Sequence, residues 1–205
     1  MPVLFDAPYP APNPRRVRIF LAEKGLSLPT RTLSIVEGQH KSAEFVAKYP
    51  PGQVPVLELD DGQILGESVA ICRYLEALHP DPPLFGIDPL SIGEIDMWIR
   101  RVEMTLMMPV GNVWVHTHPL TARIVKPQYT EFGESNRPRA VLAMERFDRV
   151  LAASPFLAGD TYTMADIILL TTIDFANFIG VKMPDNMPDL ADWHARVSTR
   201  PSARA

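Results

Sequence analysis

GQVPVL at residues 52–57 and GES at residues 66–68 are the two segments that decide how this chain folds. The sequence Asp60-Asp61-Gly62 lies between them, and an Asp-Gly pair between apolar runs is typical of a β-hairpin. We therefore predict antiparallel strands over residues 54–59 and 63–66. From Glu67 to Leu78 the apolar residues return at helical spacing, which predicts a helix directly after the hairpin.

The residues upstream of the hairpin predict two strand–helix pairs. Val3 to Phe5 is typical of a short buried strand. A helix follows, because Pro14 suits a first helical turn and Gly25 is a good stop. Alternation over residues 30–35 predicts a second strand, and residues 42–49 predict a short helix. The resulting order of strand, helix, strand, helix, hairpin and helix predicts an α/β domain over residues 1–80.

Downstream of the hairpin the strand signals stop. A proline-rich segment begins at His79, and we assign residues 81–89 to a linker. Apolar residues at three- and four-residue spacing predict a long helix over residues 92–106, which Pro109 would kink. Further helices are predicted over residues 138–151 and 190–197, and the Thr163–Asp166 capping box opens another. We predict an all-helical domain over residues 90–205 and interpret Asp166 as a structural cap.

The composition is that of an ordinary globular protein. The 205 residues are 46% apolar and 21% charged, and the formal net charge of −4 argues against a nucleic-acid-binding surface. No apolar stretch is long enough to span a membrane, and the N-terminus does not resemble a signal peptide. The single cysteine, Cys72, can form neither an internal disulfide nor a metal framework. We expect a cytoplasmic protein that binds no metal, nucleic acid or membrane.

Two features around the hairpin point to a peptide-like ligand. If the Val54–Pro55 bond is cis, the backbone N–H and C=O of Val54 turn outward and can pair with a peptide. The alternative is a turn proline at a strand start. The helix start at Glu67-Ser68 offers free N–H groups to a carboxylate, with Ser68 donating and Glu67 accepting from an ammonium group. The alternative there is a plain helix cap.

The order of five motifs resembles the glutathione transferase family. The motifs are AEKG at 22–25, GQHKSAEF at 38–45, GQVPVL at 52–57, GESVAI at 66–71, and SPFLAGD at 154–160 with TMAD at 163–166. The resemblance covers nearly the whole chain. It implies a thioredoxin-like N-terminal domain, an all-helical C-terminal domain, a two-fold homodimer and glutathione as the co-substrate.

The resemblance also implies the contacts of glutathione. Glu67 and Ser68 would hold the γ-glutamyl end, and Val54, before Pro55, would pair with the cysteinyl backbone. His40 and Lys41 would face the glycine carboxylate, with Gln53 nearby. A solvated helix start is the alternative interpretation of His40 and Lys41.

The group that activates the thiol departs from the family pattern. A free thiol has a pKa near about 8.5, so a donor must stabilise the thiolate at neutral pH. The family's usual Tyr, Ser or Cys is replaced by Ala11. Asn13 and the helix that begins beside it remain as candidates, and the loop resembles bacterial and fungal branches that lack the usual hydroxyl. In some of these branches polar groups of the helical domain hold a water, for which His116 is the candidate here. A packed histidine is the alternative.

The sequence therefore predicts a glutathione S-transferase that joins the glutathione thiol to a small apolar electrophile. Methionines near residue 104 would line an adaptable pocket for this electrophile or simply fill the core. Glutathione peroxidase activity or reductive dehalogenation would use the same thiolate. A rival from another class is a glutathione-binding regulatory or assembly module without useful catalysis, which Ala11 keeps open.

Overall fold

The computed structural model describes residues 1–205, which divide into two compact units. The first contains residues 1–83 and 201–205, and the second contains residues 84–200. The division lies within the range assigned to the linker. The last five residues differ from expectation, since they pack with the first unit and not with the helical part. Two hydrogen bonds hold these residues on α1 (Pro12–Glu23), because Arg15 donates to the Ala203 carbonyl at 2.9 Å and Ser202 donates to the Glu23 carboxylate.

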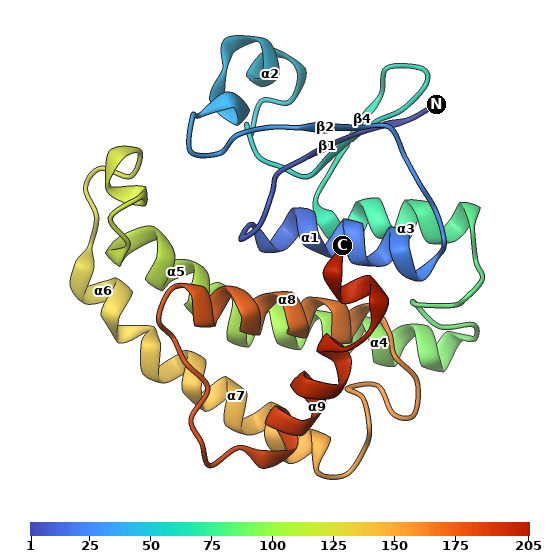
Figure 1. The fold of residues 1–205 in the computed structure, drawn as a ribbon, viewed down its shortest axis with the longest axis vertical. Helices are drawn as coiled ribbons and strands as arrows, with labels where there is room; N and C mark the ends of the chain where they lie inside the picture. The colour runs from blue at the N-terminus through green and yellow to red at the C-terminus, as the bar shows by residue number, and fades with distance from the viewer. The chain divides into compact units, whose positions relative to one another are not determined.

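The first unit has a thioredoxin-like α/β arrangement, as predicted. Its elements are β1 (Val3–Asp6), α1 (Pro12–Glu23), β2 (Thr30–Thr32), η1 (Gln39–Lys41), α2 (Ala43–Lys48), β3 (Val56–Glu58), β4 (Ile64–Gly66), α3 (Ser68–Leu78) and η4 (Pro201–Arg204). The sheet order is β2-β1-β3-β4, with β1 parallel to β2 and antiparallel to β3. Helices α1 and α3 lie side by side on one face of the sheet, and α2 lies on the other (Figure 1).

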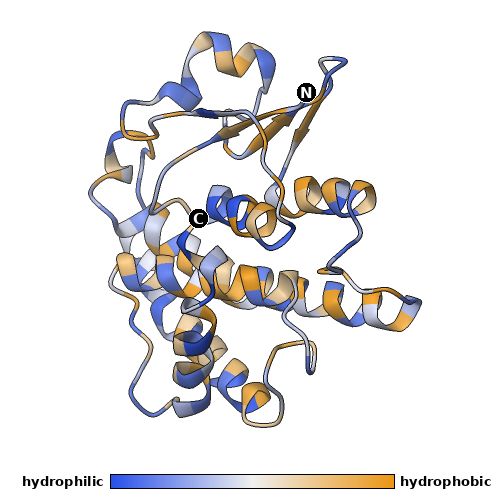
Figure 2. Cartoon of the chain, turned by 45° about the vertical axis from the view of Figure 1, so that its right-hand side comes forward, coloured by the Kyte–Doolittle hydropathy of each residue, from blue (hydrophilic) through white to orange (hydrophobic).

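Strand alternation explains how this sheet buries both faces. Phe5 and Val56 are paired across β1 and β3, and both pack against Phe45 of α2. Their neighbours Leu4 and Leu57, also paired, point to the opposite face and are almost fully buried. Strands β1, β3 and β4 accordingly carry mostly hydrophobic colour in Figure 2, whereas β2 is polar and exposed.

A buried lysine closes the C-terminal end of α1. The side chain of Lys24 is fully buried, and its Nζ donates to the carbonyl oxygens of His79, Pro80 and Pro82 at 2.8, 3.2 and 2.6 Å. It also forms an ion pair with Glu76 at 2.6 Å. The ammonium group therefore holds the chain segment after α3 against the end of α1.

The second unit is all-helical, as predicted. Its elements are α4 (Pro89–Val102), η2 (Glu103–Met107), α5 (Met108–Thr117), η3 (Thr121–Arg123), α6 (Thr130–Ser135), α7 (Arg137–Leu151), α8 (Met164–Phe178) and α9 (Pro188–Ser198). The expected kink before Pro109 takes the form of a π-helical turn, η2. Proline has no N–H to continue the regular ladder, which accounts for a wider turn just before it. None of the helices in either unit has both the length and the apolar character to cross a membrane.

The predicted capping box opens α8. Asp166 is fully buried, and its carboxylate accepts hydrogen bonds from the backbone N–H of Thr163 and Leu157 and from Trp193 Nε1, at 3.0 to 3.1 Å. Burial raises the pKa of Asp166 to about 6 even though these donors oppose the shift. Asp166 thus joins the start of α8 to α9.

Candidate functional site

The strand register brings the separate sequence motifs to one end of the sheet. Val56 at the start of β3 pairs with Phe5 near the end of β1 and with Gly66 at the end of β4. The loop to α1, the Val54–Pro55 segment and the Glu67–Ser68 turn therefore leave the sheet together. Because β2 is parallel to β1, the chain after β2 leaves at the same end and leads to His40 and Lys41.

The Val54–Pro55 segment has the features that the sequence raised as a possibility. Its peptide bond is cis, and Pro55 is buried. Val54 is half-buried, and no hydrogen bond within the protein occupies its backbone N–H or C=O. Both groups are therefore available to a ligand backbone.

Glu67 has an unusual backbone conformation at the start of α3. Its φ of 64° makes it the one non-glycine residue with a positive φ, which costs about 1 to 3 kcal/mol and persists only where surrounding structure enforces it. Such residues cluster at ligand sites. The side chain of Glu67 is exposed, while its C=O accepts from the N–H of Ile71 at 2.9 Å.

Ser68 connects the start of α3 to α1 through a residue that sequence reasoning missed. The Ser68 side chain is buried, and its Oγ accepts from Arg16 Nη1 at 3.4 Å. Arg16 is itself 2% exposed. A signal for it existed, because Arg16 is four residues before Phe20 and so lies on the apolar face of α1. The buried guanidinium of Arg16 therefore contacts the first residue of α3 from within the protein.

His40 and Lys41 lie directly beside Pro51 and Gly52. A Cβ at Gly52 would lie 3.0 Å from the His40 carbonyl and 3.1 Å from Lys41 Nζ, so glycine permits this close approach, with φ at 57°. Lys41 Nζ donates to the Pro51 carbonyl at 2.9 Å. His40 is buried with no partner for its Nδ1, and burial together with the charge of Lys41 lowers its pKa. Gln53 is exposed.

Asn13 lies in the first turn of α1, which begins at Pro12, two residues earlier than the predicted Pro14. Its Oδ1 is buried without a hydrogen-bond partner. Pro12 and Pro14 have no N–H, and the N–H of Arg15 bonds the Ala11 carbonyl at 3.4 Å. The backbone N–H of Asn13 is therefore the single free main-chain donor of this turn.

His116 belongs to α5 in the second unit and contacts α6. Its Nδ1 accepts from the backbone N–H of Tyr129 at 3.3 Å, and its ring meets Phe132 edge-on at 5.5 Å between centroids. Asn112, one turn earlier, donates to Asn136 Oδ1 at 3.2 Å. The short helix α6 was not predicted. It can approach α5 closely because Gly133 has no side chain, and a Cβ at this position would collide with Thr117.

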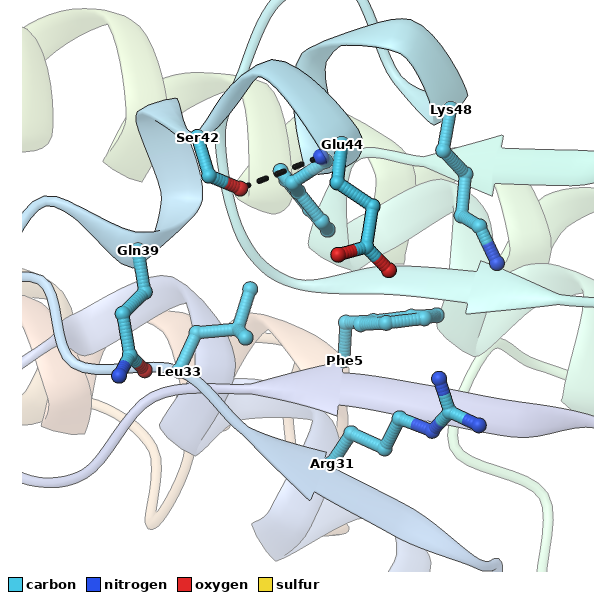
Figure 3. Close-up of a pocket in the computed structure, with 8 residues that line it drawn as sticks. Phe5, Arg31, Leu33, Gln39, Ser42, Glu44 and Lys48 are labelled. Carbon is cyan, nitrogen blue, oxygen red and sulfur yellow. Dashed lines mark hydrogen bonds between the residues drawn. The ribbon is translucent and has the colours of Figure 1, made fainter.

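A cavity of about 270 Å³ opens between α2 and the edge of the sheet (Figure 3). Its floor is the Phe5 ring, over which the Arg31 guanidinium lies at 5.8 Å from the centroid. None of the predicted ligand-binding residues lines it. No cluster of His, Cys, Asp or Glu could hold a metal ion, and burial raises the pKa of the Cys72 thiol well above its usual range.

Comparisons with known proteins match both units. The model of the glutathione S-transferase N-terminal domain matches residues 4–83, and that of the C-terminal domain matches residues 114–201. Glutathione S-transferase 2 of Saccharomyces cerevisiae is 38% identical over 205 residues, which cover 98% of this chain and 88% of the relative. Human glutathione S-transferase theta-2 is 32% identical over 189 residues, covering 89% and 75%. The crystal structure of Gtt2 from Saccharomyces cerevisiae matches with a TM-score of 0.93 at 38% identity, covering 98% of both chains.

Proposed function

Because the chain belongs to the glutathione S-transferase family, we propose that it joins the thiol of bound glutathione to a small apolar electrophile. The observation that carries this proposal is the meeting of three recognition elements at one end of a single sheet. These are the unoccupied backbone of Val54, the Glu67–Ser68 helix start and the His40–Lys41 segment. Glutathione is a tripeptide with a charged group at each end, which matches this arrangement.

Each part of glutathione has a proposed partner. The γ-glutamyl carboxylate would accept from the start of α3 and from the hydroxyl of Ser68, with the Arg16 guanidinium behind. The ammonium group would face the exposed Glu67 carboxylate. The cysteinyl backbone would pair with Val54, as an added strand pairs with a sheet edge. At the other end, the glycine carboxylate would face Lys41 and His40, with Gln53 beside them.

We propose that the thiol is activated without a side-chain hydroxyl, in the manner of family branches that lack the usual Tyr, Ser or Cys. Ala11 offers no donor, and only one main-chain N–H is free in the first turn of α1. That N–H and the side-chain Nδ2 both belong to Asn13. Each donor aimed at sulfur favours the charged thiolate and so lowers its pKa. Asn13 is thus the proposed catalytic contact, and a water held near His116 is the alternative.

The acceptor would bind an adaptable apolar surface beside the π-helical turn. Met104 lies within this turn and Met108 directly follows it, and they are 62% and 56% exposed although methionine is usually buried. Unbranched, polarisable methionines fit ligands of different shape. This composition favours small apolar electrophiles over charged ones.

The thiolate absorbance of bound glutathione, measured against pH, tests the activation proposal. Asn13→Ala should raise the pKa of the bound thiol, while affinity at low pH stays nearly constant, because only the ionised sulfur needs the donor. Ala11→Ser should lower the pKa by restoring a hydroxyl. A curve that moves with His116→Ala and not with Asn13→Ala would favour the water-mediated alternative.

Ala11 also favours a second candidate, a glutathione-binding module without useful catalysis. In that case the bound thiol of the wild-type protein would titrate like free glutathione, and neither aryl halides nor organic hydroperoxides would be turned over. Turnover of hydroperoxides alone would indicate the peroxidase alternative.

We propose further that the protein is a homodimer. Light scattering on the purified chain should then give twice the protomer mass of 22.9 kDa. A mass of one protomer at micromolar concentration would contradict this proposal.

A further inference from the structure

At Gly66, the last residue of β4, a neighbouring side chain and not the backbone conformation requires glycine. Its φ is not in the left-handed region, so an alanine could adopt the same conformation. The space for a side chain is nevertheless filled. The three atoms nearest to a Cβ placed at Gly66 all belong to Tyr49, namely the hydroxyl oxygen, Cζ at 2.5 Å and Cε2 at 2.9 Å.

Both Tyr49 and Gly66 are held in place by other contacts. Tyr49 caps the C-terminal end of α2, where its N–H bonds the Phe45 carbonyl at 2.8 Å and its C=O accepts from Gly52 at 2.9 Å. Its ring packs on the core cluster that contains Val56. Gly66 in turn is paired with Val56 across β3 and β4. The ring and the strand end are therefore pressed together from both sides.

The contact lies next to the residue whose backbone most needs support. Glu67 follows Gly66 directly and has the one positive φ outside glycine. Burial raises the pKa of Tyr49, and the negative charge of the nearby Glu67 carboxylate raises it further. Such a conformation persists only where its surroundings over-determine it.

We propose that the ring of Tyr49, seated against the bare Cα of Gly66, is a positioning element that fixes the Glu67–Ser68 turn for the γ-glutamyl end of glutathione. This proposal rests on the proposed function of that turn. Tyr49 acts through Gly66 and Glu67 and is a positioning residue. Displacing the turn by as little as ~1 Å would misalign both ligand contacts, and a misplacement of that size can lower an enzyme's reaction rate about 10²-fold.

A double-mutant cycle on glutathione affinity tests the proposal, read by titration calorimetry. Gly66→Ala should weaken binding at least tenfold, because the new methyl group meets the Tyr49 ring. Tyr49→Leu keeps apolar packing but removes Cε2, Cζ and the hydroxyl, so Gly66→Ala combined with Tyr49→Leu should bind more tightly than Gly66→Ala alone. Tyr49→Phe retains Cζ and Cε2 and should give little rescue. Effects of the two substitutions that simply multiply would overturn the proposal.

A truncated ligand shows which end of glutathione is affected. Gly66→Ala should weaken glutathione and γ-glutamylcysteine by similar factors, whereas Lys41→Ala should weaken only glutathione, whose glycine it faces. If Gly66→Ala is too unstable to titrate, recovery of the melting temperature by Tyr49→Leu replaces the affinity comparison. A wild-type protein that binds no glutathione would overturn the proposed function and this proposal together. If the wild type binds glutathione but the effects of Gly66→Ala and Tyr49→Leu on affinity are independent, only the positioning role of Tyr49 is overturned.

Discussion

At the scale of single residues, the proposed role of Ser68 in binding depends on how its hydroxyl is held. It is buried at a helix start and accepts from a guanidinium that is itself buried. Arg16 therefore leaves the Ser68 proton free to point toward a carboxylate. The two residues are 52 positions apart in sequence, and only the packing of α1 against α3 joins them.

Ser68→Ala should weaken glutathione binding by roughly 1.5 to 3 kcal/mol, the range for hydrogen bonds to charged groups. Titration calorimetry measures this loss. Ser27→Ala, at an exposed serine of the same unit, is the matched control and should leave affinity unchanged. Unchanged affinity in Ser68→Ala would remove Ser68 from the site.

Among the residues of the proposed site, those in local motifs could be predicted from the sequence better than those brought in by packing. Val54, Glu67 and Ser68 are recognisable because a proline, a strand end and a helix start follow each other along the chain. Arg16 and Tyr49 contribute through contacts between elements distant in sequence. Periodicity can place Arg16 on an apolar face, but it cannot say which serine lies opposite.

At the scale of elements, the start of α8 depends on a carboxyl group whose ionisation is hindered. The pKa of Asp166 is about 6 in the folded protein and 3.8 in an unfolded chain. The folded state therefore binds this proton more tightly than the unfolded state does. The stability that this provides is complete below pH 3.8 and is lost as the pH rises through about 6.

Asp166→Asn should remove that pH dependence. Between pH 4 and pH 7 the free energy of unfolding of the wild type should fall relative to the variant by up to ~3 kcal/mol, at 1.36 kcal/mol per unit of pKa difference. Urea unfolding at several pH values measures both proteins. A difference between them that stays constant with pH would mean that the carboxyl group is ionised throughout.

Element boundaries were predictable where periodicity is long and capping is explicit. Helices α7 and α8 begin within one residue of the predicted positions because a proline or a capping box marks each start. Helix α9 begins at Pro188, two residues before the predicted Leu190. The π-helical turn could not be predicted, because its residues continue the same apolar stripe as α4. Helix α6 was missed because it is short and polar, and the closeness to α5 that Gly133 allows is a tertiary property.

At the scale of the whole molecule, the chain returns to the unit in which it began. Residues 201–205 follow the helical unit yet pack on α1 through Ala203 and Ser202. The first unit is therefore discontinuous in sequence. Its stability depends on residues that follow the helical unit in the sequence.

Removing residues 201–205 should lower the free energy of unfolding by about 3 to 6 kcal/mol, at about 1.5 to 3 kcal/mol for each of two lost hydrogen bonds that involve charged side chains. Urea unfolding measures the loss, and hydrogen exchange should localise it to α1. Arg204→Ala, at an exposed side chain, is the control. Equal protection of α1 in the truncated and full-length proteins would show that the tail is dispensable.

The oxygens around Lys24 form a host like a crown ether, whose guest is tethered by a covalent bond. Three carbonyls and a carboxylate enclose one ammonium ion, as a macrocycle encloses a cation. Because the lysine is covalently attached, its ammonium group cannot be lost by dilution or removed by a chelator, unlike a bound metal ion.

Lys24→Ala should remove the ammonium group from these oxygens and lower the free energy of unfolding by about 3 to 5 kcal/mol, as for a broken buried ion pair. Methylammonium should then restore part of the melting temperature, whereas the larger tetramethylammonium, which has no N–H to donate, should not.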